Sequence, residues 1–223
     1  MNKHFSSGVK ASCPACLGVI PVGISFGLLA VQAGLKGIEA VSMSVMVMAG
    51  SAQLMAISMI TQGAALSTII LGTFFINLRH LVMSGSVMRR MKGTTLWMRL
   101  LGAYALCDES FAVYSLSEDD SYSFLLGANT ALYGSFVSST VIGCLMTGFL
   151  PQIVVDSFGV AFYAAFLGLL FPSVKHNTRL IILVLITAAL NWLLQCLLPA
   201  SWSVILSMIL GALIGVFFVE DEA

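Results

Sequence analysis

The sequence predicts an all-α, polytopic integral membrane protein, a bundle of seven or eight helical segments. Of its 223 residues, 59% are apolar and only 9% are charged. A soluble domain carries about 25% charged residues, so the chain is too poor in charge for a soluble globular or a disordered protein. Stretches such as 180–190 are apolar all round, which favours helices over the alternating strands of a membrane β-barrel.

Four long uncharged runs set the number of predicted segments. They contain 25, 39, 35 and 40 residues and lie between Lys10 and Lys36, Glu39 and Arg79, Asp120 and Asp156, and Arg179 and Glu220. A helix needs about 20 apolar residues to cross a bilayer, so each run holds one or two segments. Turn-forming residues divide the runs into 13–34, 40–60, 64–86, 98–117, 124–148, 153–172, 178–197 and 201–219.

Each predicted segment ends at a turn signal that contains glycine, proline or charged residues. The breaks fall at Gly34–Gly37, Thr61–Gly63, Arg89–Gly93, Glu118–Ser121, Gly148–Pro151, Pro172–Lys175 and Pro199–Ser201. Because the connections are short, residues 13–219 are predicted to form a single transmembrane domain. We expect an N-terminal tail at 1–12 and an acidic C-terminal tail at 220–223.

The first segment is expected to be a retained span that is broken or re-entrant. Lys3 and Lys10 precede it, but no A-x-A cleavage site follows before Lys36. The residues that weaken a helix within it are Pro14, Gly18, Pro21, Gly23 and Gly27.

A broken segment also bears on the orientation of the chain. The basic loop around Arg89 and Arg90 favours the cytoplasm, which places the acidic loop at 118–120 outside. The basic N-terminus favours the cytoplasm too, yet three full spans would separate it from the Arg89 loop. Either one early segment does not cross completely, or one of the two charge signals does not hold.

Composition and motifs exclude several functions. Ten Lys and Arg residues balance ten Asp and Glu residues, so no net field favours a nucleic-acid partner. The chain has no H-E-x-x-H, G-x-S-x-G, Walker A or EF-hand pattern, and we expect neither an enzyme nor a bound metal or cofactor. Cys13 and Cys16 form a C-x-x-C pair, but it opens an apolar span instead of a thioredoxin-like domain.

Polar clusters lie inside the predicted spans, where polar groups are costly and are therefore candidates for function. Ala49–Gln53 combines small residues with an amide, which suits either helix packing or a binding site with Ser51 and Gln53. In Asn77–His80, Arg79 needs a carboxylate, carbonyl groups or the membrane interface. The alternative is that Arg79 snorkels to the interface and that His80 is a hydrogen-bonded structural residue.

A third cluster, Asp108–Ser110, places two adjacent carboxylates inside the fourth segment. On a helix they point about 100° apart, so they cannot serve one site equally. Asp108 or Glu109 can pair with Arg79 while the other faces water or a substrate ammonium, and two close carboxylates suit a proton carrier. The alternative is that the helix ends there in a wet interface.

The order of these features resembles the AzlC family, the large subunits of branched-chain amino-acid exporters. The resemblance rests on Gly18, Pro21, Phe26–Gly27, Gly34, Ala49–Gln53, Asn77–His80 and Asp108–Phe111. It covers the first half of the chain specifically, and the second half matches mainly in hydropathy. Leu54 stands where an aromatic residue is expected and Cys107 where a threonine is common, and these departures concern substrate details.

The resemblance implies export of Val, Leu, Ile and similar apolar amino acids across the bacterial inner membrane. It also implies a separately encoded small membrane subunit of the AzlD type. No ATPase motif is present, which favours a secondary transporter. The alternatives are a channel or uniporter for another small solute, and a structural membrane subunit that transports nothing.

The chemistry of such a substrate selects the candidate site residues. A zwitterion needs a cation or helix N-termini for its carboxylate, a carboxylate or carbonyl groups for its ammonium, and an apolar wall for its side chain. The expected substrate-binding residues are Pro21, Gly23, Phe26, Gly27, Ser51, Gln53, Asn77 and Arg79. Met46, Met48 and Phe75 are expected to add to the wall, and proton coupling or an ion pair is expected at His80, Asp108 and Glu109.

Overall fold

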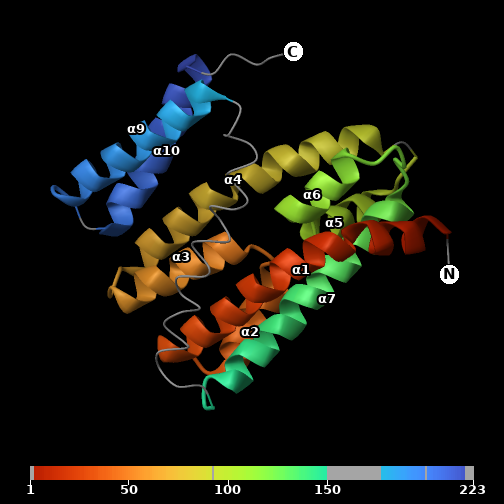
Figure 1. The fold of residues 1–223 in the computed structure, drawn as a ribbon, viewed down its shortest axis with the longest axis horizontal. Coiled ribbons are helices and arrows are strands. Elements are labelled where there is room, and N and C mark those ends of the chain that lie inside the picture. The colour runs from red at the N-terminus through yellow and green to blue at the C-terminus, as the bar shows by residue number, and fades with distance from the viewer. Residues whose placement is uncertain (1–2, 92, 150–176, 199, 219–223) are drawn as a thin grey trace.

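The computed structural model describes residues 3–91, 93–149, 177–198 and 200–218, which form helices and no strand (Figure 1). The helices are α1 (Lys3–Gln32), α2 (Gly37–Met46), α3 (Gly50–Thr61), α4 (Leu66–Arg90), α5 (Leu96–Tyr104), α6 (Asp108–Ser115), α7 (Tyr122–Met146), α9 (Thr178–Gln195) and α10 (Ala200–Phe218). The predicted segments 64–86, 124–148, 178–197 and 201–219 are confirmed as α4, α7, α9 and α10. The predicted segment 153–172 lies outside the described residues.

Helices α1 and α7 run side by side in the same direction (Figure 1). Their backbones touch at glycines. A Cβ atom on Gly8 would lie 2.1 Å from the carbonyl oxygen of Phe124, and one on Gly27 would lie 2.4 Å from that of Thr140. Similar close approaches are made by Gly23, Gly127 and Gly143. The small residues therefore let the two helices approach more closely than larger side chains would permit.

The expected break in the first segment is wrong. Helix α1 is continuous over 30 residues and contains both Pro14 and Pro21. It begins at Lys3, so residues 3–12, expected as a tail, are helical. Each proline removes one backbone hydrogen bond, but the close packing on α7 from Gly8 to Gly27 holds the helix together across them.

The second predicted segment is interrupted instead. Helix α2 ends at Met46 and α3 begins at Gly50. Helix α2 starts beside the end of α7, where Gly37 faces Cys144. Its last turn reaches only the middle of α7, where the carbonyl oxygen of Val45 accepts a hydrogen bond from the Tyr133 hydroxyl at 2.6 Å.

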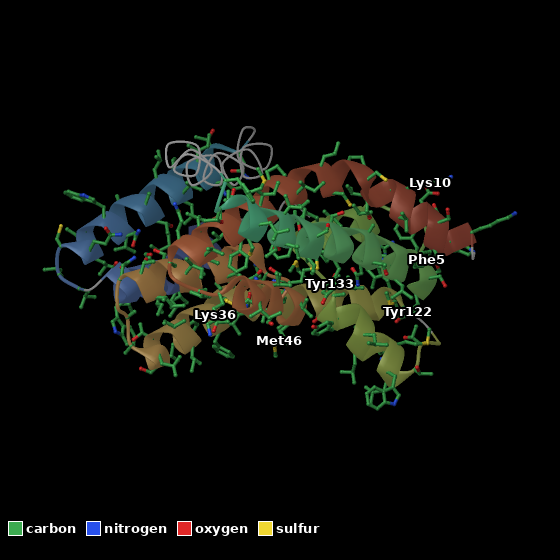
Figure 2. The ribbon with its side chains drawn as sticks, turned by 90° about the horizontal axis from the view of Figure 1, so that it is seen from below. Phe5, Lys10, Lys36, Met46, Tyr122 and Tyr133 are labelled. Carbon is green, nitrogen blue, oxygen red and sulfur yellow. The ribbon has the colours of Figure 1, made fainter. Side chains whose placement is uncertain are left out.

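Helix α3 then returns to the end from which α2 came. It starts at Gly50 against Val22 and Phe136, in the middle of α1 and α7. Farther along, Leu54 and Ile57 pack in one cluster with Phe26, Ala30 and Ala40. In Figure 2, Met46 lies between Lys36 and Lys10 along the length of the bundle, and Lys10 lies near one end. We call α2 and α3 the first hairpin.

The fourth predicted segment is also interrupted, at Ala105–Cys107, and forms a second hairpin of α5 and α6. At its tip, the carbonyl oxygen of Leu106 accepts a hydrogen bond from His80, in the middle of α4, at 3.1 Å. At the far end of α6, the carbonyl oxygen of Ser115 accepts one from Arg90, the last residue of α4, at 3.2 Å. Helix α6 therefore returns toward the end of α4 from which α5 departs.

The two hairpins enter the bundle from opposite ends, and their tips meet in the middle. The Tyr104 hydroxyl, at the tip of the second hairpin, donates to the carbonyl oxygen of Val45, at the tip of the first, at 2.5 Å. The four hairpin helices have 8 to 12 residues each. At 1.5 Å per residue each spans about 12–18 Å, roughly half of a bilayer core of about 30 Å.

Helices α9 and α10 pack against each other, and α10 also contacts α4. A Cβ on Gly211 of α10 would lie 2.7 Å from the hydroxyl oxygen of Thr187 of α9. This pair therefore joins the bundle through α4.

Candidate functional site

A cavity of about 550 Å³ lies where the two hairpin tips meet α1, α4 and α7. This volume falls within the range of about 300–1,000 Å³ that is usual for small-molecule sites. Its polar lining residues are Ser51, Arg79, His80, Asp108 and Glu109. Its apolar wall includes Val19, Val22, Met48, Val113, Leu116 and Phe136. The cavity thus combines charged groups with an apolar wall.

Arg79 connects the beginnings of two short helices. Its Nη2 atom donates to the Ser51 hydroxyl at 2.7 Å, in the first turn of α3, and lies 2.9 Å from Oδ2 of Asp108, the first residue of α6. The side chains of Arg79 and Asp108 are 38% and 30% exposed, so a ligand in the cavity can reach both. Within the described residues, the buried Nε atom of Arg79 has no hydrogen-bond partner.

His80 follows Arg79 on α4 and holds the tip of the second hairpin. Its Nδ1 atom lies 3.1 Å from the Leu106 carbonyl oxygen, which can only accept, so Nδ1 carries the proton. In the neutral ring, the other nitrogen, Nε2, is then an acceptor. It is buried, and none of the described residues gives it a hydrogen-bond partner. His80 therefore keeps one free proton-accepting atom beside the Arg79–Asp108 pair.

The hairpin breaks also place helix N-termini at the cavity. Ala49, the residue before α3, has no side-chain oxygen to cap the first N–H groups of that helix. Before α6, the N–H of Cys107 donates to the Ser110 hydroxyl at 3.0 Å. Asp108 and Glu109 occupy the first turn of α6, where the helix dipole favours negative charge.

Five of the eleven residues predicted for the site line the cavity: Ser51, Arg79, His80, Asp108 and Glu109. The other six do not. Gly23 and Gly27 contact α7, and Phe26 is fully buried in the core beside Ala30. Pro21 is exposed elsewhere on α1. Of the residues expected for the wall, Met48 lines the cavity, whereas Met46 and Phe75 do not.

Gln53 and Asn77 also lie outside the cavity. The Gln53 side chain is buried, with 2% exposed. Its amide nitrogen can donate to the Val47 carbonyl oxygen while its amide oxygen accepts from the Ser44 hydroxyl, each at 3.1 Å. It therefore stabilises the turn of the first hairpin. Asn77 faces a separate groove with Thr73 and Phe74, and its Oδ1 atom has no partner among the described residues.

The sequence prediction missed the contacts that support the hairpin tips. The hydroxyls of Tyr104 and Tyr133 both donate to the Val45 carbonyl oxygen. In addition, the Asn129 amide of α7 donates to the Gly102 carbonyl oxygen, near the end of α5, at 3.0 Å. These side chains satisfy carbonyl groups that a helix end leaves without partners. A tyrosine or an asparagine in an apolar segment hints at such a bond, but nothing in the sequence identifies the acceptor.

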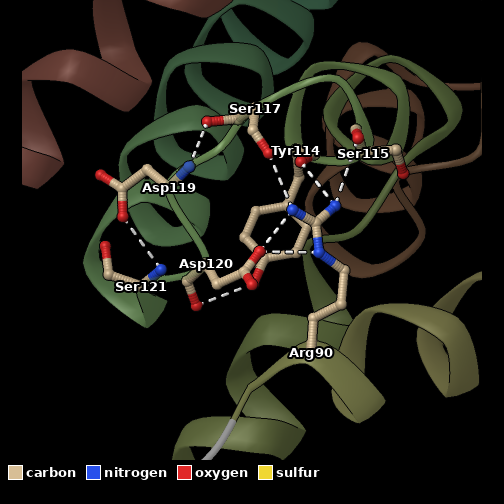
Figure 3. A network of polar contacts seen from close by, with 7 residues as sticks. All are labelled: Arg90, Tyr114, Ser115, Ser117, Asp119, Asp120 and Ser121. Carbon is tan, nitrogen blue, oxygen red and sulfur yellow. Dashed lines mark hydrogen bonds and ion pairs between the residues drawn. The ribbon is translucent and has the colours of Figure 1, made fainter.

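The outer end of the second hairpin is fastened by Arg90 (Figure 3). The guanidinium pairs with Asp120 and donates to the backbone carbonyls of Tyr114, Ser115 and Ser117 at 2.8–3.2 Å. It also lies over the Tyr114 ring, 4.8 Å from the ring centre. A cation at these carbonyls stabilises the C-terminal end of α6.

The same end of the bundle carries the N-terminus of α1. His4 Nδ1 lies 2.7 Å from Oδ2 of Asp119, in the loop before α7. Partial burial by itself raises the pKa of Asp119. The hydrogen bonds from His4 and Ser121 outweigh it and lower that pKa below its ordinary value. Since Asp119 is next to the partner of Arg90, the acidic loop lies at the same end as the basic one.

A bundle of apolar helices with a partly charged cavity between interrupted helices is the arrangement found in many secondary transporters. Among the described helices, α1, α4 and α9 are long and apolar enough to cross a membrane. No group of three His, Cys, Asp or Glu residues in the described ranges is arranged to hold a metal ion. The fold thus defines a helical membrane protein, and the cavity is its candidate small-molecule site.

Comparison with known proteins gives the family. A family model described as AzlC protein matches residues 14–150, and the chain belongs to the AzlC family. An uncharacterized membrane protein of Archaeoglobus fulgidus is 34% identical over 173 residues, which is 77% of this chain and 76% of that protein. One of Helicobacter pylori is 30% identical over 148 residues, 62% of this chain and 64% of that protein.

A further relative carries a functional name. The branched-chain amino acid transport protein AzlC of Bacillus subtilis is 28% identical over 119 residues, which cover 51% of this chain and 46% of that protein. No solved structure gives a significant match. The relatives and the apolar helices agree that this chain is a membrane protein.

Proposed function

We propose that this chain is a secondary transporter that exports branched-chain and similar apolar amino acids across the bacterial inner membrane. We propose further that it works with a small membrane subunit of the AzlD type. The observation that carries the proposal is the cavity in which Arg79, Asp108 and Glu109 face an apolar wall. The name of the Bacillus subtilis relative supports the substrate class.

The cavity suits the three parts of an apolar amino acid. The substrate carboxylate binds the partly exposed guanidinium of Arg79, with help from the uncapped start of α3. The ammonium binds the carboxylate of Asp108 or Glu109. The side chain lies against the apolar wall around Met48 and Phe136. A bound zwitterion therefore replaces part of the Arg79–Asp108 ion pair with contacts of its own.

The hairpins suggest how the chain sits in the membrane. We propose that α1 and α4 cross the bilayer, and that α7 crosses beside α1, against which it packs along its length. Each hairpin then enters the bilayer only halfway, from opposite sides. Two crossings, α1 and α4, then separate the N-terminus from the basic loop at Arg89, so both lie on the same side. This arrangement satisfies both positive-inside signals and brings irregular backbone to the middle of the membrane only where it lines a cavity.

Export coupled to protons would use the titratable groups beside Arg79. His80 offers its free Nε2 atom, and Asp108 and Glu109 offer carboxylates that can be protonated when Arg79 turns to the substrate. A proton taken up on one side of the membrane would then travel against the exported amino acid.

The decisive experiment is efflux of labelled leucine or valine from preloaded cells that express this chain with its small subunit. The test variant is Arg79→Gln, which removes the cation from the cavity. The control is Arg89→Gln, which removes a cation of the same helix whose Nε atom contacts the Gly85 carbonyl outside the cavity. A lost charged hydrogen bond costs about 1.5–3 kcal/mol, so Arg79→Gln should slow efflux about tenfold or more.

The control should keep efflux close to that of the wild type. Equal efflux from both variants would remove Arg79 from the substrate site. No efflux above that of cells without the chain, with both subunits present in the membrane, would contradict export of these amino acids. Efflux that never runs against a concentration gradient would indicate a uniporter or channel.

A further inference from the structure

We infer that Gly18 sets the upper size of the amino-acid side chain that the cavity accepts. This inference rests on the proposed function and adds a specificity-determining residue to it. Gly18 lies on α1 and lines the same cavity as the charged groups contributed by α4 and α6.

The face of α1 that borders the cavity has regular helical spacing. Its lining residues are Ala15, Gly18, Val19 and Val22, at positions i, i+3, i+4 and i+7. Position 18 lies about midway along this face, between Ala15 and Val22. The next residue on this face, Val19, packs with Met48 and Phe136, so the lining beside Gly18 is apolar.

Helix packing does not explain this glycine. Gly8, Gly23 and Gly27 each face the backbone or a side chain of α7 at less than 3.0 Å from an added Cβ, whereas a Cβ on Gly18 meets nothing within 4 Å. Glycine inside a helix is less favourable than alanine. Among the described residues, no contact with a neighbouring helix requires glycine at position 18, which lines the cavity.

A larger side chain at this position should fill the cavity without disturbing the fold. Leucine in Gly18→Leu would occupy the space that a substrate side chain needs. One methylene more or less in an apolar pocket changes discrimination by about 10- to 200-fold. We therefore expect efflux of leucine to fall at least about tenfold more than efflux of alanine.

The matched control is Gly134→Leu. Gly134 lies on α7, outside the cavity lining, and a Cβ there also meets nothing within 4 Å. Both variants thus add the same side chain at an uncrowded helical glycine. The experiment compares efflux of labelled leucine and labelled alanine from preloaded cells that express each variant with the small subunit. The expected result is a leucine-to-alanine ratio that falls only in Gly18→Leu.

The outcomes separate this inference from the proposed function. If the wild type exports both amino acids and Gly18→Leu keeps the ratio of Gly134→Leu, the size filter is wrong while export stands. If the wild type exports neither, the proposed function and the filter both fail. If the wild type exports leucine and alanine but Gly18→Leu exports neither amino acid, the smaller substitution Gly18→Ala tests the size filter. A lower leucine-to-alanine ratio in Gly18→Ala supports the filter, and an unchanged ratio overturns it.

Discussion

At the scale of single residues, the organising contact is the bond of Arg79 to two short helices at once. Ser51 and Asp108 lie 57 positions apart in the chain, yet one Nη2 atom reaches both. Removal of the arginine leaves Asp108 without its ion-pair partner, and removal of Asp108 leaves the arginine with Ser51. The two substitutions therefore have different effects on the charge of the cavity.

The titratable residues of the cavity give a prediction on proton coupling. In the double variant Asp108→Asn, Glu109→Gln, neither carboxylate can take up a proton, so efflux should lose its dependence on external pH. His80→Gln, which retains hydrogen-bonding groups, tests the remaining candidate. The measurement is the initial rate of leucine efflux, compared with the wild type, over a range of about one pH unit on either side of the ordinary histidine pKa of about 6.5.

Two results would contradict this prediction. A double variant with the pH profile of the wild type would exclude both carboxylates as proton carriers. If His80→Gln alone abolished the pH dependence while the double variant kept it, the proton would be carried on the imidazole. Immunoblots of the membrane fraction would show that each variant is inserted.

At the scale of elements, the α1–α7 pair shows what the glycines of the first segment do. The sequence indicated a helix weakened by glycine and proline, whereas the structure uses Gly23 and Gly27 for contact with α7. The helix breaks occur instead in the second and fourth predicted segments. There, hydroxyl and amide groups from other helices satisfy the carbonyls at the breaks.

This packing predicts that one methyl group added on the α1 face against α7 lowers the stability of the fold. In Gly27→Ala, the new Cβ would lie 2.4 Å from a backbone oxygen of α7, which cannot move aside as a side chain can. Overpacking of this kind costs about 1–3 kcal/mol, which corresponds to a loss of several degrees in melting temperature. Thermal denaturation of the detergent-solubilised protein, followed by size-exclusion chromatography, measures it.

The control for this substitution is Gly134→Ala, which adds the same methyl group to α7 where nothing lies within 4 Å. It should leave the melting temperature unchanged or raise it slightly, because alanine favours the helix. Equal melting temperatures of the two variants would contradict the close approach of α1 and α7.

At the scale of the whole molecule, the opposed hairpins predict a specific topology. Position 7 in α1 and position 94 after α4 should lie on one side of the membrane, and position 62 before α4 on the other. Single cysteines in a cysteine-free variant (Ser7→Cys, Thr94→Cys and Gln62→Cys) can be labelled with a membrane-impermeant maleimide in intact cells and in inverted vesicles. Ser7→Cys and Thr94→Cys should be labelled in the same preparation.

Labelling of positions 7 and 94 from opposite sides would show that the first hairpin crosses the membrane fully. The acidic loop offers an internal control, because the Arg90–Asp120 pair places it beside the basic loop. Glu118→Cys should therefore be labelled together with Thr94→Cys, in contrast to the expectation from charge alone that the loop at 118–120 lies outside.

The sequence by itself determined the class of this protein and the position of most of its helices. Long uncharged runs have no stable place in water, so composition and charge spacing sufficed for a helical membrane protein. The cost of polar groups in an apolar segment likewise indicated candidate site residues, of which Ser51, Arg79, His80, Asp108 and Glu109 line the cavity. Each of these conclusions depends on local properties of the chain.

Only the tertiary structure decided which segments are interrupted and which residues share the cavity. A helix break is stable where distant groups satisfy its open carbonyls, as Tyr104, Tyr133 and Asn129 do. Conversely, α1 stays helical through Pro14 and Pro21 because α7 packs closely against it. The partners lie tens of residues away along the chain, so the local sequence favoured a break in the wrong segment.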